Sequence, residues 1–145
     1  MRRFRFRLQP LVRLRSQLER NARRELATAM AAVNQVEQQQ AAAAQGLREC
    51  ADQAAGADAV GMLARSLEVG LRRHKWRLDK QLAVAERGLT KAQGDYAQRA
   101  RDLKVLQQLR DKRRDEWRLE VQRAEQAELD ELSRLQRGIQ VGGED

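Results

Sequence analysis

The chain has 145 residues, of which 34% are charged and only 3% are aromatic. This composition, in which Ala and Leu supply most of the apolar residues, is typical of long helices and excludes a β-sandwich or β-barrel. The net charge is +8 and falls into blocks, because residues 1–24 and 72–118 each carry +8 whereas residues 25–71 and 119–145 each carry −4. Blocks of alternating sign predict separate contact surfaces along an elongated molecule.

Two features of the sequence indicate the cellular compartment in which the protein works. Cys50 is the only cysteine, so the chain forms no internal disulfide and no cysteine-based metal cluster. No apolar run approaches the roughly 18–20 residues of a membrane span, and the basic start lacks the apolar segment of a signal peptide. We therefore expect a cytoplasmic protein.

Two helices are expected in chain order. Pro10 suits a first helical turn, and no proline follows it. The pattern predicts one helix over about 9–54, a turn over about 55–58 and a second helix over about 58–138. In the turn, Gly56 is expected to close the first helix in the left-handed conformation, and Asp58 to cap the second. A short flexible tail over 139–145 completes a single domain spanning 1–145.

The first predicted helix has one apolar seam with steps of three and four residues. Two steps of four fall together across Leu18, Ala22 and Leu26, which predicts a stutter that locally unwinds the supercoil. Cys50 on this seam is expected to be a small apolar filler. The predicted seam is Leu11, Leu14, Leu18, Ala22, Leu26, Ala29, Val33, Val36, Gln40, Ala43, Leu47, Cys50 and Ala54.

The second predicted helix has a seam of the same kind, typical of the a and d positions of heptads. His74 falls on it and is expected to be a polar core residue. Beyond about Asp111 the helix is poor in seam residues until Leu129, Leu132 and Leu135. The predicted seam is Val60, Leu63, Leu67, Leu71, His74, Leu78, Leu82, Ala85, Leu89, Ala92, Tyr96, Arg99, Leu103 and Leu106.

Two narrow apolar seams joined by a short turn are expected to face each other. The predicted fold is all-α, a long antiparallel two-helix coiled-coil hairpin. At 1.5 Å per residue the helices are about 70 Å and about 120 Å long, so the second overhangs the first.

The sequence argues against catalysis. A two-helix hairpin offers no water-excluding pocket in which reacting groups could converge. The single histidine excludes a two-histidine metal site, and neither a GxxxxGK[ST] nor a GxGxxG motif occurs. We expect no enzyme activity, no cofactor, no metal and no small-molecule ligand.

The basic arm at the start alternates arginine with Phe4, Phe6 and Leu8. It could bind nucleic acid phosphates, an anionic membrane or an acidic protein surface. Basic regions that enter DNA extend from parallel zippers, so an antiparallel hairpin disfavours nucleic acid. The basic run 112–114 has acids on both sides, which favours a solvated helix face.

Both ends of the chain resemble the FliJ family, small coiled-coil proteins of the bacterial flagellar type III export apparatus. The resemblance lies in the opening FRFRLQPLVRLR, the segment VLQQLRDKRRDEW at 105–117 and the segment EQAELDE at 125–131. It extends over nearly the whole chain in length and layout. The middle, 40–100, matches only in pattern.

The resemblance implies a non-catalytic stalk that enters the hexameric ring of the export ATPase and promotes its assembly and activity. It also implies contacts with the cytoplasmic domain of the export gate and with export chaperones, and a peripheral position at the cytoplasmic face of the inner membrane. A basic module that binds nucleic acid, or a homo-oligomeric scaffold, remains the alternative. The residues implied to contact the ring are Leu8, Leu11, Leu14, Arg15, Leu109, Arg113, Arg114, Trp117, Gln126 and Leu129.

Overall fold

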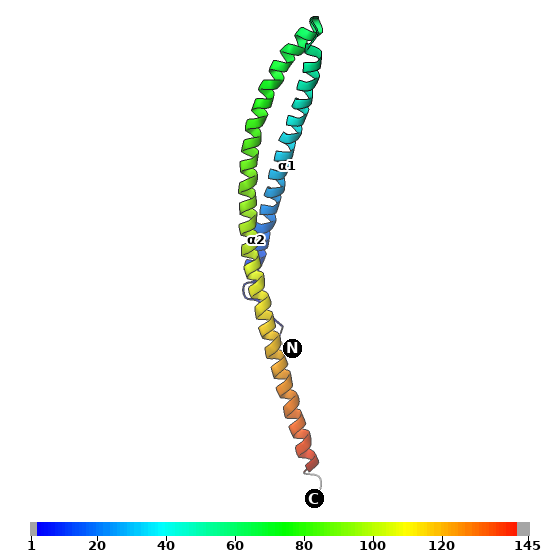
Figure 1. Cartoon of the computed structure of the whole chain (residues 1–145). Coiled ribbons are helices and arrows are strands. Elements are labelled where there is room, and N and C mark those ends of the chain that lie inside the picture. The colour runs from blue at the N-terminus through cyan, green and yellow to red at the C-terminus, as the bar shows by residue number, and fades with distance from the viewer. Residues whose placement is uncertain (1–2, 142–145) are drawn as a thin grey trace. The chain divides into compact units, whose positions relative to one another are not determined.

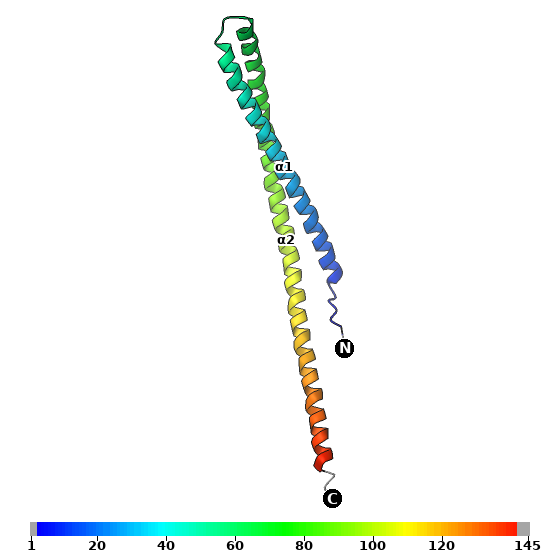
Figure 2. The same ribbon diagram turned by 90° about the vertical axis from the view of Figure 1, so that its right-hand side faces the viewer.

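The structure, a computed structural model, describes residues 3–141 and the side chains of residues 3–139. Helix α1 is Gln9–Ala54 and helix α2 is Ala59–Val141. The described residues contain no strand, and the two long helices pack against each other as an antiparallel hairpin. Figures 1 and 2 show the chain reversing at the short turn between α1 and α2. The all-α hairpin expected from the sequence is therefore confirmed.

Contacts group the described chain into two compact units. The turn unit is Ser16–Ala100, and the terminal unit consists of residues 3–15 and 101–141. Within each unit the pairing is antiparallel: Gln40 contacts Asp79 and Gly46 lies near Leu71 in the turn unit, and Arg15 contacts Asp102 in the terminal unit. The expectation of one domain over 1–145 stays a prediction.

The turn is built by Asp58 and two glycines. The Asp58 carboxylate accepts a hydrogen bond from the Gly61 backbone N–H at 3.0 Å, as an N-cap does, and its carbonyl accepts one from Met62 N–H. A Cβ on Gly61 would lie 2.0 Å from the Gly56 carbonyl oxygen, so only glycine fits this close approach. The left-handed conformation expected for Gly56 is wrong, because no described glycine has a positive φ. Arg65 instead bonds the Ala54 and Gly56 carbonyls, which satisfies the end of α1.

We expect Asp58→Ala to lower the free energy of unfolding by about 1 kcal/mol, because it removes the cap of α2. Urea unfolding followed by circular dichroism at 222 nm measures the change. Asp52→Ala is the matched control, since Asp52 is an exposed acid of α1 for which the structure shows no partner. An equal loss in both variants would contradict a capping role for Asp58.

The observed seam of α1 is regular where the sequence predicted a stutter. Towards its start, the side chains that face α2 are Val12, Arg15 and Glu19. Leu14 is 55% exposed, and Leu11 and Leu18 are half-buried at the flanks. A pattern of apolar residues favours the leucines one position away, because Arg15 and Glu19 are charged. With these two in place, the seam alternates steps of three and four without interruption from Val12 to Ala54.

Glu19 is a buried acid on this seam, and a neighbouring arginine pairs with it. Arg23 donates to its carboxylate at 2.6 Å. This hydrogen bond to Glu19, with a second contact to Tyr96, raises the pKa of Arg23 above its ordinary value. The buried Glu19 carboxylate therefore lies against a charged guanidinium group.

The start of the α2 seam also differs from the expectation. Small residues, Gly61 and Ala64, are buried there, while Val60, Leu63 and Leu67 are 57%, 70% and 57% exposed. His74 is exposed and is not the expected core residue. From Leu71 onwards, the other expected seam positions through Leu106 are buried or half-buried, and Leu78 is the most deeply buried at 1% exposure. Cys50 is buried, as expected of a small filler.

The end of α2 carries no packed seam. Every side chain from Gln122 to Ile139 is exposed, including Leu129, Leu132 and Leu135 at 58%, 57% and 59%. Residues 139–141, expected in the tail, belong to α2, and residues 142–145 of that expected tail lie outside the described residues. Neither helix, over the residues described, has a stretch apolar and long enough to cross a membrane.

Candidate partner-binding site

In the terminal unit, the arm that precedes α1 folds against α2. The Phe4 ring lies 5.9 Å from the Trp117 ring, centroid to centroid, in a tilted arrangement. The arm turns into α1 through backbone hydrogen bonds from Gln9 N–H to the Phe6 carbonyl and from Val12 N–H to the Leu8 carbonyl. An aromatic pair of this geometry stabilises the contact beyond its buried area. Phe4 and Trp117 thus hold the arm on α2.

A first groove, which we call the aromatic groove, lies between arm and helix and has a volume of about 660 Å³. Its arm side is residues 4–8, and its α2 side is Leu109, Arg113, Glu116, Trp117 and Glu120. Arg113 donates to Glu116 at 3.1 Å, so the α2 side of the groove contains an ion pair. Apolar rings beside charged groups suit a partner that offers both kinds of contact.

A second groove, the arginine groove, has a volume of about 560 Å³. Four arginines line it without an acid: Arg5 and Arg7 from the arm, and Arg110 and Arg114 from α2. Phe4, Phe6 and Gln9 complete the lining. Guanidinium groups gathered in this way favour carboxylate or phosphate groups, which they bind through two parallel hydrogen bonds.

Arg15 and Asp102 join α1 to α2 in the terminal unit. Their side chains meet at 3.2 Å and are 34% and 28% exposed. Partial burial makes such a pair worth more than one fully in water. Arg15 therefore has a structural task within this unit, which the sequence did not indicate.

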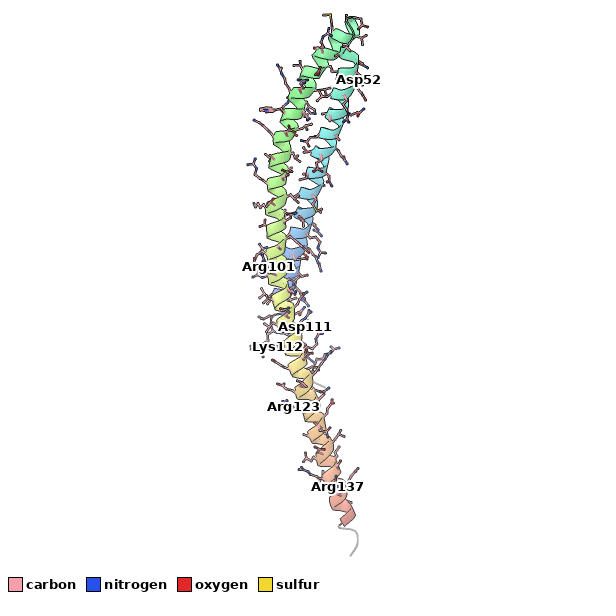
Figure 3. All side chains as sticks on the ribbon, in the orientation of Figure 1. Asp52, Arg101, Asp111, Lys112, Arg123 and Arg137 are labelled. Atoms are coloured by element: carbon pink, nitrogen blue, oxygen red, sulfur yellow. The ribbon has the colours of Figure 1, made fainter. Side chains whose placement is uncertain are left out.

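The surrounding field is strongly positive. Residues 3–15 and 101–120 together carry twelve Arg and Lys side chains against five carboxylates. Arg101, Asp111 and Lys112, labelled in Figure 3, lie along this part of α2. Among the described residues, no three His, Cys, Asp or Glu side chains gather so as to hold a metal ion. The arrangement is suited to binding an acidic surface.

The structure brings together about half of the residues that the sequence nominated for the ring contact. Those at the two grooves are Leu8, Leu109, Arg113, Arg114 and Trp117. Leu11 is half-buried beside the seam, Leu14 is exposed on α1, and Arg15 is engaged with Asp102. Gln126 and Leu129 lie on the exposed end of α2, where the Gln126 amide donates to Asp130 at 3.2 Å.

Eight residues that line the grooves are absent from the set expected from the sequence: Phe4, Arg5, Phe6, Arg7, Gln9, Arg110, Glu116 and Glu120. Two signals could have indicated the arm residues among them. An antiparallel hairpin brings the start of the chain to the distal half of the second helix, and Phe4 and Trp117 are two of only five aromatic residues. Aromatic residues that a hairpin brings to the same region are candidates for mutual contact.

Comparison with known proteins gives one family. Residues 4–138 match the family described as Flagellar FliJ protein, which covers both helices and the arm. No curated protein and no solved structure matches the chain. The match extends over well more than half of the chain and agrees with its two-helix fold. The chain therefore belongs to the FliJ family and is a coiled-coil protein related to flagellar export.

Proposed function

We propose that this protein is a non-catalytic stalk of the flagellar type III export apparatus, and that its terminal unit binds within the ring of the export ATPase. The observation that carries the proposal is the pair of grooves between arm and α2, with twelve cations against five carboxylates around them, in a chain of this family. An acidic ring opening would pair with the guanidinium groups through charge-assisted hydrogen bonds and would steer the terminal unit into place.

The residues of the two grooves would make the main contact with the ring. Arg113 and Arg114 would supply charge, while Trp117, Leu8 and Leu109 would supply apolar area. Leu14 and Leu129, exposed at 55% and 58%, would add apolar contacts outside the grooves. Leu11, Arg15 and Gln126 complete the proposed set.

The proposal extends to the wider apparatus. Members of this family are expected to associate with components of the export apparatus, and the partners we propose are the ATPase hexamer, the cytoplasmic domain of the export gate and the export chaperones. The protein would then work in the cytoplasm, at the face of the inner membrane where that apparatus sits. The charge blocks along the sequence support more than one contact surface.

The test is stimulation of ATP hydrolysis by the purified export ATPase. We expect the wild-type protein to raise the rate. Replacing Arg113, Arg114 and Arg13, an exposed residue near the start of α1, by Glu should reduce the stimulation by about tenfold or more, because like charges would then meet. The rate of phosphate release and the ring content seen by electron microscopy are measured together.

The matched control replaces three exposed arginines of the turn unit, Arg20, Arg24 and Arg87, by Glu. It makes the same change in net charge and should stimulate like the wild type. Helicity by circular dichroism should be unchanged in both variants. No stimulation by wild-type protein at several-fold excess, or equal losses in both variants, would overturn the proposal.

A further inference from the structure

The first turns of α2 expose large apolar side chains to solvent. The buried or half-buried residues there are Gly61, Ala64, Glu68 and Leu71, and the opposite side of the helix is exposed. We call that side the outer face of α2. Every one of its residues between 59 and 84 is exposed, and they are Ala59, Val60, Met62, Leu63, Ser66, Leu67, Val69, Gly70, Arg73, His74, Trp76, Arg77, Lys80, Gln81, Ala83 and Val84.

The first half of the outer face is uncharged from Ala59 to Gly70. Its apolar side chains are far from buried, with Leu63 at 70% and Met62 at 65% exposure. They occupy four of the seven heptad positions, which is much wider than the two-position seam that a single partner helix covers. An apolar face of this width fits a broad, flat apolar medium better than it fits another helix.

The second half of the outer face is basic. Arg73, Arg77 and Lys80 lie on it, and the whole face from 59 to 84 contains no carboxylate. The acids of α1 nearest the turn, Glu49 and Asp52, fall by the heptad register on the side of α1 that points away from α2, where Figure 3 labels Asp52. In this part of the hairpin most of the positive charge and the exposed large apolar side chains therefore lie on α2, whose two carboxylates between 59 and 84, Glu68 and Asp79, fall outside the outer face.

Trp76 stands where the apolar half meets the basic half. The Lys80 ammonium lies 3.8 Å from the centre of its ring, and the Trp76 side chain is 59% exposed. Tryptophan beside lysine and arginine is the combination that concentrates at the boundary between lipid headgroups and acyl chains.

We propose that the outer face of α2 docks on an anionic lipid surface, with the apolar half entering the headgroup boundary and the cations pairing with lipid phosphates. An interfacial helix uses this combination of a wide apolar face, flanking arginine and lysine, and tryptophan. Charge argues against a second copy of the chain as occupant, because its three cations would add to those already on the face. The contact would lie in the turn unit and needs no other protein.

The test is co-sedimentation with vesicles of phosphatidylglycerol and phosphatidylcholine, compared with vesicles of phosphatidylcholine alone. We expect binding to the anionic vesicles that weakens as salt rises, since the lipid charge is screened. Replacing Leu63 and Leu67 by Gln should reduce the bound fraction by about tenfold, because the apolar contribution is lost.

The matched control is Leu132→Gln with Leu135→Gln. These leucines are 57% and 59% exposed on α2, outside the outer face, and their replacement should leave binding unchanged. Equal binding to both vesicle types, or equal losses in both double variants, would overturn the proposal. Self-association lost in the Leu63 and Leu67 variant, with no vesicle binding by wild type, would assign the face to a second copy and also overturn it.

Two single-tryptophan proteins decide which part of the chain meets the lipid. Trp117→Phe leaves Trp76 as the only tryptophan, and its emission should shift to the blue on anionic vesicles. Trp76→Phe leaves Trp117, whose emission should not shift. The reverse pattern would place the lipid contact at the arm and overturn the proposal. The assay contains no ATPase, so its failure is distinct from failure of the proposed stalk function.

Discussion

Leu78→Ala should lower the free energy of unfolding by about 2–4 kcal/mol, because Leu78 is the one large side chain of the described residues that is almost fully buried, at 1% exposure. Its removal deletes apolar contact in a protein whose other buried apolar residues are no larger than valine. Urea unfolding followed by circular dichroism measures the loss.

Leu63→Ala is the informative comparison, because the sequence placed Leu63 and Leu78 on the same seam. Leu63 is 70% exposed in the structure, so its replacement should change the free energy of unfolding by no more than about 0.5 kcal/mol. A loss in Leu63→Ala as large as that in Leu78→Ala would show that the register expected from the sequence is the real one.

Gly61→Ala should cost about 2 kcal/mol of folding free energy or more, since the new methyl group would lie 2.0 Å from a backbone oxygen that no side-chain movement can clear. The shift it forces would also disturb the hydrogen bond between Gly61 N–H and Asp58. Thermal unfolding by circular dichroism, at equal protein concentrations, measures the effect.

Gly94→Ala is the control for Gly61→Ala. A Cβ on Gly94 would meet nothing within 4 Å, and Gly94 lies well inside α2. Alanine there should stabilise the protein by about 0.5–1 kcal/mol, because it favours the helix. The two Gly→Ala substitutions should thus change the free energy of unfolding in opposite directions. A loss of stability in both variants would contradict the close approach at the turn.

Helix type and pairing could be predicted from the sequence, whereas part of the register could not. Val60, Leu63 and Leu67 have the same spacing as Gly61, Ala64 and Glu68, shifted by one residue. A rule that rewards large apolar residues selects the first set. The structure selects the second, because the close approach at Gly61 leaves room only for small side chains at the first two positions, Gly61 and Ala64.

The same ambiguity affects the start of α1. Leu11, Leu14 and Leu18 compete with Val12, Arg15 and Glu19, and the second set wins although two of its members are charged. Arg15 reaches Asp102 and Glu19 is bonded by Arg23, so both charges are paired where they lie. A charge on a helix seam becomes tolerable only with its partner in place, and Asp102, the partner of Arg15, is 87 residues away in the sequence.

The candidate site could be predicted only in outline. The hairpin explains why residues near position 4 and residues near position 117 share one unit. Which face of α2 the arm covers depends on the Phe4 and Trp117 contact, and no periodicity encodes it because the arm is not helical. Leu129, Leu132 and Leu135 have the spacing of seam residues, and the structure leaves all three exposed.

The small side chains inside the hairpin affect how the stability of the protein depends on temperature. Half of the eight buried apolar residues of the described chain are alanines, namely Ala22, Ala43, Ala64 and Ala92, and the others are Cys50, Val12, Val33 and Leu78. Heat capacity rises on unfolding in proportion to the apolar area newly hydrated. A core of methyl groups hydrates little, so the stability of this protein should change gently with temperature, without the strongly curved profile of a globular domain of equal length.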